Sequence, residues 1–144
     1  MRFSNIIVAV DIYDADNGRE ALARAAAIAG DEGRLHLLYV RYYLPSRYTE
    51  LLGQDFDLQE QRDAMTAMHE WCAELSIAES RVDFVTRRGP VRDEVISYAQ
   101  SQNADLIVLG SHQPSFSSKL LGSNASAIVH HSPISVLIAR TGKK

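Results

Sequence analysis

The sequence has very little cysteine and no long hydrophobic run. Its 144 residues include a single cysteine, Cys72, so an internal disulfide is excluded. The first residues, MRFSNIIVAVD, turn polar after a handful of apolar residues, which is too early for a signal peptide or a membrane span. We therefore expect a cytoplasmic protein without membrane insertion.

An excess of positive charge is also missing. The formal net charge is −3 and the isoelectric point is near 5.9. Because binding to a nucleic acid backbone needs a basic surface, we do not expect nucleic acid as a partner. Hydrophobic residues make up 46% and charged residues 23% of the chain, which argues against disorder and against a fibrous repeat. The length suits one domain, residues 1–144, with a real core.

Five short segments have the composition of β-strands. Three are continuous apolar runs, as in parallel strands buried on both faces, and two are shorter or more alternating, as in strands nearer a sheet edge. The three runs are Asn5–Val10, Leu35–Val40 and Leu106–Leu109, and the other two segments are Val82–Val85 and Ile134–Ala139.

Four helical patterns lie between these segments. The first follows a cap at Asp16 or Asn17, and the third has Pro90 in its first turn, where the missing N–H is harmless. The second carries an apolar stripe that includes Cys72, which is therefore expected in the core. The stretch from Arg41 to Asp57 is the only long irregular segment, and it fits a lid, an oligomer contact or plain surface.

The alternation of strands and helices predicts an α/β fold, a doubly wound parallel sheet of five strands with helices on both faces. In such sheets a ligand lies outside the carboxyl ends of the strands, at the point where the strand order reverses. Asp11, Val40 and Gly110 stand at the ends of three of the strands. These three distant residues are therefore predicted to meet at one crevice.

The segment from Asp105 to Ser123 has the composition of a phosphate-binding loop. Gly110 follows the apolar run, where a backbone must turn tightly or approach a ligand closely. Small hydroxyl residues and Lys119 come next, and the triplet Gly122–Asn124 stands before the helical segment ASAIVHH. A helix N-terminus presents free N–H groups that favour anions. The pattern predicts a nucleotide site, with an ordinary strand–loop–helix connection as the alternative.

Four segments carry a resemblance to a known family: IIVAVD, LHLLYV, RGPVRDEVISYAQSQNADLIVLGSH and LLGSNASAIVHHSPISVLIAR. Over essentially its whole length the chain resembles a single-domain universal stress protein. The resemblance implies an adenine nucleotide alpha hydrolase-like fold with strand order 3-2-1-4-5. It also implies a stress-response role and a symmetric homodimer joined through the final strand, Ile134–Ala139, whose six residues carry no charge to repel a second strand.

The loop matches the nucleotide-binding members of that family in part. Their pattern is G-x-x-G, a spacer of nine residues, then glycine and a serine or threonine. Gly110, Gly122 and Ser123 fit, but Gln113 stands in place of the second glycine and the spacer is one residue shorter. The ending LLGSNAS resembles a bacterial branch that departs in the same way and is associated with adenine nucleotides. The pair His112 and Gln113 resembles the branch that does not bind ATP.

The resemblance implies a site for ATP, with or without Mg²⁺. In it, the Ser123 hydroxyl and neighbouring amides hold phosphate oxygens, His112 donates to the α-phosphate, Asp11 lies near the ribose and phosphates, and Val40 meets the adenine through its backbone. From the residues alone, Asp11 is equally a turn or helix-capping aspartate. The full set of expected binding residues is Val10, Asp11, Val40, Gly110, Ser111, His112, Gly122, Ser123 and Asn124.

Two classes of function compete. The first is a regulatory protein that binds ATP or AMP and at most hydrolyses ATP slowly or phosphorylates itself, because no catalytic base has motif support. The second is a nucleotide-free dimeric module that binds a regulatory protein, which Gln113 favours. A phosphotransferase with a loop serine such as Ser123 as acceptor is a weaker third reading. Asp14 and Asp16 lack a neighbouring histidine or cysteine, so no metal site is predicted.

Overall fold

The computed structural model describes residues 3–41, 46–111 and 122–140, with side chains excluded for 46–56. Five strands form one sheet in the order β3-β2-β1-β4-β5, and each neighbouring pair is parallel. The strands are β1 (Asn5–Val10), β2 (Arg34–Arg41), β3 (Val82–Arg88), β4 (Leu106–Gly110) and β5 (Val136–Ala139). The predicted fold class and strand order are confirmed.

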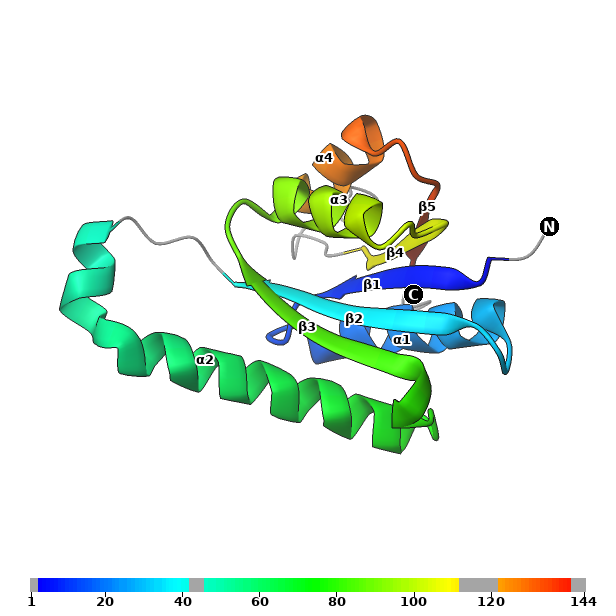
Figure 1. The fold of residues 1–144 in the computed structure, drawn as a ribbon, viewed down its shortest axis with the longest axis horizontal. Coiled ribbons are helices and arrows are strands. Elements are labelled where there is room, and N and C mark those ends of the chain that lie inside the picture. The colour runs from blue at the N-terminus through cyan, green and yellow to red at the C-terminus, as the bar shows by residue number, and fades with distance from the viewer. Residues whose placement is uncertain (1–2, 42–45, 112–121, 141–144) are drawn as a thin grey trace.

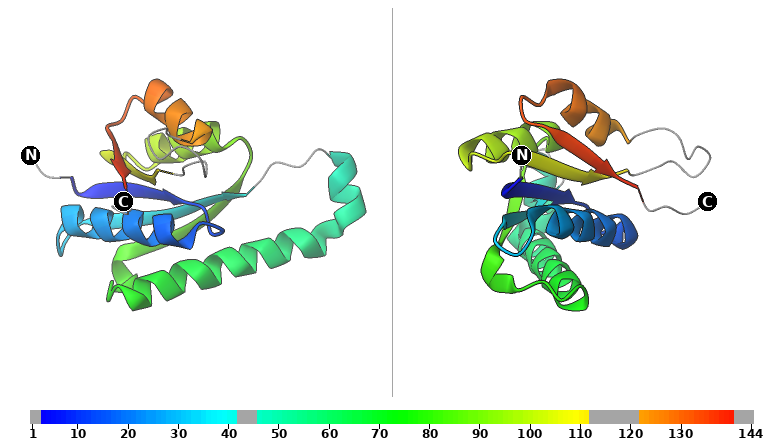
Figure 2. Two further views of the ribbon diagram at one scale, coloured as in Figure 1. Left: turned by 180° about the vertical axis from the view of Figure 1, so that it is seen from behind. Right: turned by 90° about the vertical axis from the view of Figure 1, so that its right-hand side faces the viewer.

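Helices cover both faces of the sheet (Figure 1). They are α1 (Ala15–Ala29), α2 (Ser46–Glu74), α3 (Val91–Ser101) and α4 (Ser123–His131), with a single 3-10 turn at Glu79–Arg81. Figure 2 shows α1 and α2 on one side of the sheet and α3 and α4 on the other. The first turns of α2 project beyond the carboxyl ends of the strands.

The central strands are apolar throughout because both of their faces are buried. Ile6 and Val8 of β1 pack in the cluster that includes α1 and α2, and Ile7 packs in the cluster that includes α3 and α4. All three side chains are fully buried. The two clusters hold the helical layers against the sheet.

Several element boundaries differ from the prediction, for local reasons. Strand β3 continues to Arg88 because Arg87 and Arg88 remain paired with the end of β2, although their charge breaks the apolar pattern. Strand β5 begins at Val136 instead of Ile134, since the Ser132 hydroxyl bonds both the N–H and the C=O of Ile134 and holds a turn there.

The stretch from Arg41 to Asp57 is not a long irregular segment, so that prediction was wrong. Arg41 is the last residue of β2, and α2 already begins at Ser46; residues 42–45 lie outside the described part. Gly53 lies within this helix, and one glycine costs a helix only about 1 kcal/mol. The leucine, glutamate and glutamine residues around it favour a helix.

Helix α1 starts at Ala15, ahead of the predicted caps at Asp16 and Asn17, with Asp14 at the N-cap position. It packs closely on α2: a Cβ at Gly18 would lie 2.6 Å from Cη2 of Trp71. Cys72, the next residue of α2, is fully buried as predicted. Burial raises the pKa of its thiol to about 11.

Candidate functional site

A cavity of about 410 Å³ opens at the carboxyl ends of β1, β2 and β4. Its volume is in the range of small-molecule sites, and it lies at the switch point of the sheet, where doubly wound folds bind ligands. It brings together most of the residues predicted from the sequence. Those on its wall are Val10, Asp11, Val40, Gly110, Gly122, Ser123 and Asn124.

Two predicted site residues are not placed on this wall. Ser111 is buried, and its N–H donates to the C=O of Ala139 at 3.1 Å, so this amide extends the β4–β5 pairing. His112 lies outside the described residues, as do Gln113 and Lys119. Gly110 at one end of the family's loop pattern, and Gly122 and Ser123 at the other, lie on the cavity wall.

Asp11 closes the turn between β1 and α1. One oxygen of its carboxylate, Oδ1, accepts the N–H of Tyr13 at 2.9 Å, and its C=O accepts the N–H of Asp14 at 3.0 Å. Its side chain is exposed and also lines the cavity. Asp11 can therefore be both a turn residue and a carboxylate that faces a ligand.

Gly110 has a packing reason to be glycine. A Cβ at this position would lie 2.9 Å from the Cβ of Asn17 and 3.1 Å from the Asn17 backbone oxygen. The first turn of α1 therefore lies directly against the end of β4. The close approach expected at Gly110 is made by this helix, and it fixes one corner of the cavity.

The N-terminus of α4 forms another part of the wall. The helix begins at Ser123, so Ser123 and Asn124 belong to its first turn and do not precede it as predicted. Gly122 is the N-cap and has no side chain to cap the helix, and its C=O accepts the N–H of Ser126 at 2.9 Å. The first N–H groups of a helix have no partner within it, and they favour an anion.

An acidic wall faces the cavity from the α1 and α2 side of the sheet. It consists of Asp11, Asp14 and Glu60, and Glu60 Oε2 accepts the hydroxyl of Tyr39 at 3.1 Å. Burial, followed by the charge of Glu60, raises the pKa of Tyr39. Burial and the nearby Glu60, Asp63 and Asp11 also raise the pKa of Tyr13. Among the described residues on the cavity wall there is no lysine, arginine or histidine.

Sequence reasoning missed five polar residues on this wall: Tyr13, Asp14, Asn17, Tyr39 and Glu60. Tyr39 had a usable signal, because it is a residue with a polar tip within an otherwise apolar strand. Glu60 had none, since nothing in its neighbourhood distinguishes it from the other acidic residues of α2. Across the described ranges, no three metal-ligating side chains are grouped to hold a metal ion, and no helix is long and apolar enough to cross a membrane.

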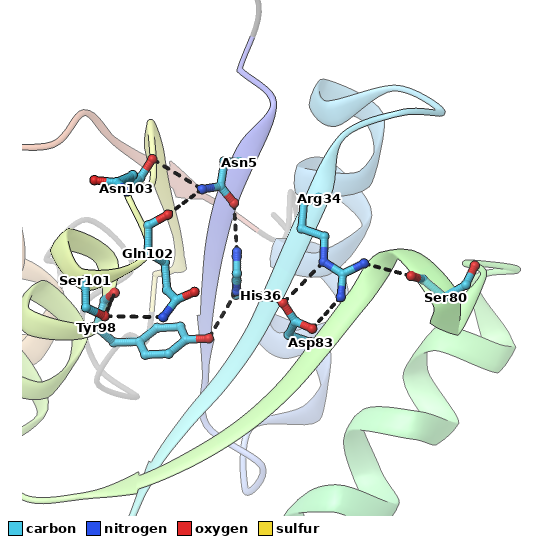
Figure 3. A network of polar contacts seen from close by, with 9 residues as sticks. All are labelled: Asn5, Arg34, His36, Ser80, Asp83, Tyr98, Ser101, Gln102 and Asn103. Atoms are coloured by element: carbon cyan, nitrogen blue, oxygen red, sulfur yellow. Dashed lines mark hydrogen bonds and ion pairs between the residues drawn. The ribbon is translucent and has the colours of Figure 1, made fainter.

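A second polar cluster lies at the opposite, amino end of the strands (Figure 3). The buried ring of His36 has Nε2 2.7 Å from Asn5 Oδ1 and Nδ1 3.1 Å from the hydroxyl of Tyr98. Asn5 Nδ2 donates to the carbonyls of Gln102 and Asn103, so Asn5 Oδ1 is the acceptor and Nε2 carries the hydrogen. Neutral His36 therefore accepts the Tyr98 hydroxyl at Nδ1.

The strand order and the cavity at the switch point define the class of this protein: an α/β protein with the adenine nucleotide alpha hydrolase-like fold. Residues 2–140 match the model of the universal stress protein family, and the chain belongs to that family.

Individual relatives agree over nearly the full length. The chain is 34% identical over 141 residues to universal stress protein G of Escherichia coli O157:H7, covering 96% of this chain and 99% of that one. The structure of universal stress protein UspA from Lactobacillus plantarum superposes with a TM-score of 0.79 at 26% identity, covering 97% and 99%. A universal stress protein crystallised in complex with cAMP shares the fold, with a TM-score of 0.67 at 20% identity and coverage of 99% and 100%.

Proposed function

We propose that this protein is an adenine-nucleotide-binding regulator of the universal stress response, binding ATP or AMP in the cavity at the carboxyl ends of the strands. The observation that carries the proposal is the N-terminus of α4, where the N-cap residue is a glycine, on the wall of a cavity of about 410 Å³, at Gly122, Ser123 and Asn124. The complex of a fold relative with cAMP, itself an adenine nucleotide, supports the same class of ligand.

In this proposal the phosphates bind at the first turn of α4. The hydroxyl of Ser123 and the backbone N–H groups of Ser123 and Asn124 donate to phosphate oxygens, and His112 adds a donor. The adenine lies against the backbone of Val40, and Val10 belongs to the same wall. Asp11 takes a ribose hydroxyl or a Mg²⁺ ion that arrives with the nucleotide.

The same geometry supports binding more than catalysis. Among the described residues on the cavity wall, the titratable groups are carboxylates and tyrosines, and no histidine, lysine or arginine stands with them to act as a base or to hold a leaving phosphate. Purified protein should therefore hydrolyse ATP far more slowly than about 10 per second, or phosphorylate its own loop serines in part. Turnover at ordinary enzyme rates would favour the phosphotransferase reading.

Two measurements test the nucleotide. Mass spectrometry of the small molecules released by denaturing the purified protein should detect an adenine nucleotide, and calorimetry should measure ATP binding directly. A Gly122→Val variant places a branched side chain where phosphate approaches the backbone and should lose binding with an unchanged circular dichroism spectrum. Ala127→Val, on the same helix but away from the cavity wall, is the control. Equal ATP binding by Gly122→Val and the parent would contradict the site.

A nucleotide-free interaction module is the second candidate, favoured by Gln113 and by the acidic wall. Both candidates include a cytoplasmic homodimer, joined through Ile134–Ala139, that acts on a regulatory protein. Supporting this, β5 is an edge strand whose Val136, Leu137 and Ile138 are partly exposed and uncharged. Light scattering on the parent and on Val136→Lys tests the dimer, and a monomeric parent or an unaffected variant removes this strand from the interface.

A further inference from the structure

We infer that Glu60 is a specificity-determining residue whose carboxylate accepts a hydrogen bond from an N–H or O–H group of the nucleoside part of the bound nucleotide. The inference rests on the proposed function and deepens it. It assigns a role to α2, a helix that neither the loop pattern nor the strand ends connected with the site.

Among the described residues, the carboxylate of Glu60 has one hydrogen-bond partner, Tyr39. Tyr39, which is 5% exposed in the floor of the cavity, donates its hydroxyl to Glu60 Oε2 at 3.1 Å. A carboxylate has about four acceptor positions, so this bond orients the group and leaves acceptor capacity on the cavity side. Among the described residues, no lysine or arginine forms an ion pair with Glu60, so a salt bridge does not explain why a carboxylate stands at this position.

The charges of the cavity wall determine whether the phosphates or the nucleoside of a bound nucleotide lie next to Glu60. Helix α4 packs on one face of the sheet with α3, while Glu60 comes from α2 on the opposite face. The positive end of the α4 dipole attracts phosphate, and the wall of Asp11, Asp14 and Glu60 repels it. The uncharged half of the nucleotide therefore faces Glu60, and what that half offers a carboxylate is hydrogen-bond donors: the ribose hydroxyls and the amino group of the base.

The test compares Glu60→Gln with Asp63→Asn. Asp63 lies one turn further along α2, is exposed, accepts a bond from Gln59 and does not line the cavity. Both changes remove one negative charge from the same helix, so long-range repulsion of phosphate changes alike. Calorimetry with ATP should give an affinity about tenfold lower for Glu60→Gln than for Asp63→Asn, the typical loss when a hydrogen bond to a charged group is weakened.

Three analogues identify the donor: 2′-deoxy-ATP, 3′-deoxy-ATP and the triphosphate of purine riboside, which lacks the amino group. The affinity ratio between the two variants should fall toward one for the analogue that lacks the donor. A ratio near one with ATP itself, or a ratio that stays high with all three analogues, overturns the inference while the proposed function stands. Failure of the parent to bind ATP overturns the proposed function and this inference with it.

Discussion

The polar groups at the two ends of the sheet differ in where their hydrogen-bond partners lie. At the amino ends of the strands, His36 bonds both Asn5 and Tyr98, and Asn5 also bonds two backbone carbonyls, so these polar groups have their partners within the protein. At the carboxyl ends, both the first turn of α4, which has glycine as its N-cap, and the carboxylate of Glu60 line a cavity. Polar groups that satisfy each other stabilise a fold, and polar groups that face an open cavity can take their partners from a ligand. Stability and binding should therefore respond to changes at different ends.

The largest loss of stability is expected at the amino end, from Asn5→Ala. The change leaves Nε2–H of the buried His36 without its acceptor and removes the donor to the carbonyls of Gln102 and Asn103. The free energy of unfolding should fall by about 2–3 kcal/mol in urea denaturation. ATP affinity should stay as in the parent. Gln102→Ala is the control, because among the described residues its side chain bonds the neighbouring Ser101 hydroxyl alone. A weakened ATP affinity in Asn5→Ala would contradict the separation of stability from binding.

A change between the two helices beneath the cavity should affect both properties. Gly18 lines the cavity and lies against Trp71, and in Gly18→Ala the new methyl group would sit 2.6 Å from the ring. Overpacking should cost about 1–2 kcal/mol of stability after the gain in helix propensity, and ATP binding should weaken. Adding Trp71→Phe, a smaller ring, should recover part of the loss in a double-mutant cycle. Purely additive effects would contradict the contact.

Acid should weaken the amino end through His36. Burial, with a contribution from Arg34, lowers the pKa of this histidine, while Asp83 opposes the shift. The unfolded chain therefore takes up a proton first, so stability is complete above the ordinary histidine pKa and falls as pH drops toward the lowered value. The slope cannot exceed about 1.4 kcal/mol per pH unit for one proton. Urea denaturation between pH 8 and 5 should show this slope for the parent and not for His36→Gln. An equal slope in both proteins would mean that groups other than His36 cause the pH dependence.

The smallest change in stability is expected from Arg34→Gln. Arg34 pairs with Asp83 near the surface, where ion pairs contribute about 0–1 kcal/mol. The variant removes a positive charge beside His36 and frees Asp83, whose Oδ2 lies 3.3 Å from His36 Nδ1. The pKa of His36 should rise, as measured by NMR of its ring protons. Arg24→Gln, which breaks the surface pair with Glu20, should leave that pKa in place; a similar shift in both variants would rule out a local effect.

The sheet could be predicted because burial on two faces leaves a continuous apolar run, as in Asn5–Val10, which matches β1 at both ends. Prediction failed where that apolar signal is missing. Arg87 and Arg88 extend β3 through backbone pairing, and α2 begins at Ser46 within the stretch that was predicted to be irregular. The end of β3 depends on pairing with the neighbouring strand, and the start of α2 depends on average helix propensity. A local apolar pattern reveals neither.

The candidate site divides in the same way. Asp11, Val40, Gly110 and Ser123 could be predicted because strand ends and helix starts are visible in the sequence and the topology brings them together. Glu60 could not, since it reaches the cavity from the middle of a long helix whose path depends on tertiary packing. Ser111 was expected on the wall from its place after Gly110, but its backbone N–H continues the pairing with β5. Topology predicted the crevice, and packing determined its other wall.

Because Cys72 is buried, the rate at which its thiol can be labelled reports on the opening of α2. A thiol must ionise and meet the reagent before it reacts, and the folded protein hinders both, with full burial and a pKa raised to about 11. Because the sequence has no other cysteine, every labelling event comes from this one position in α2. The labelling rate thus counts how often that helix lifts from the sheet. Glu60 lies on the same helix, so slower labelling of Cys72 in the presence of ATP would show that the ligand stabilises α2 against opening.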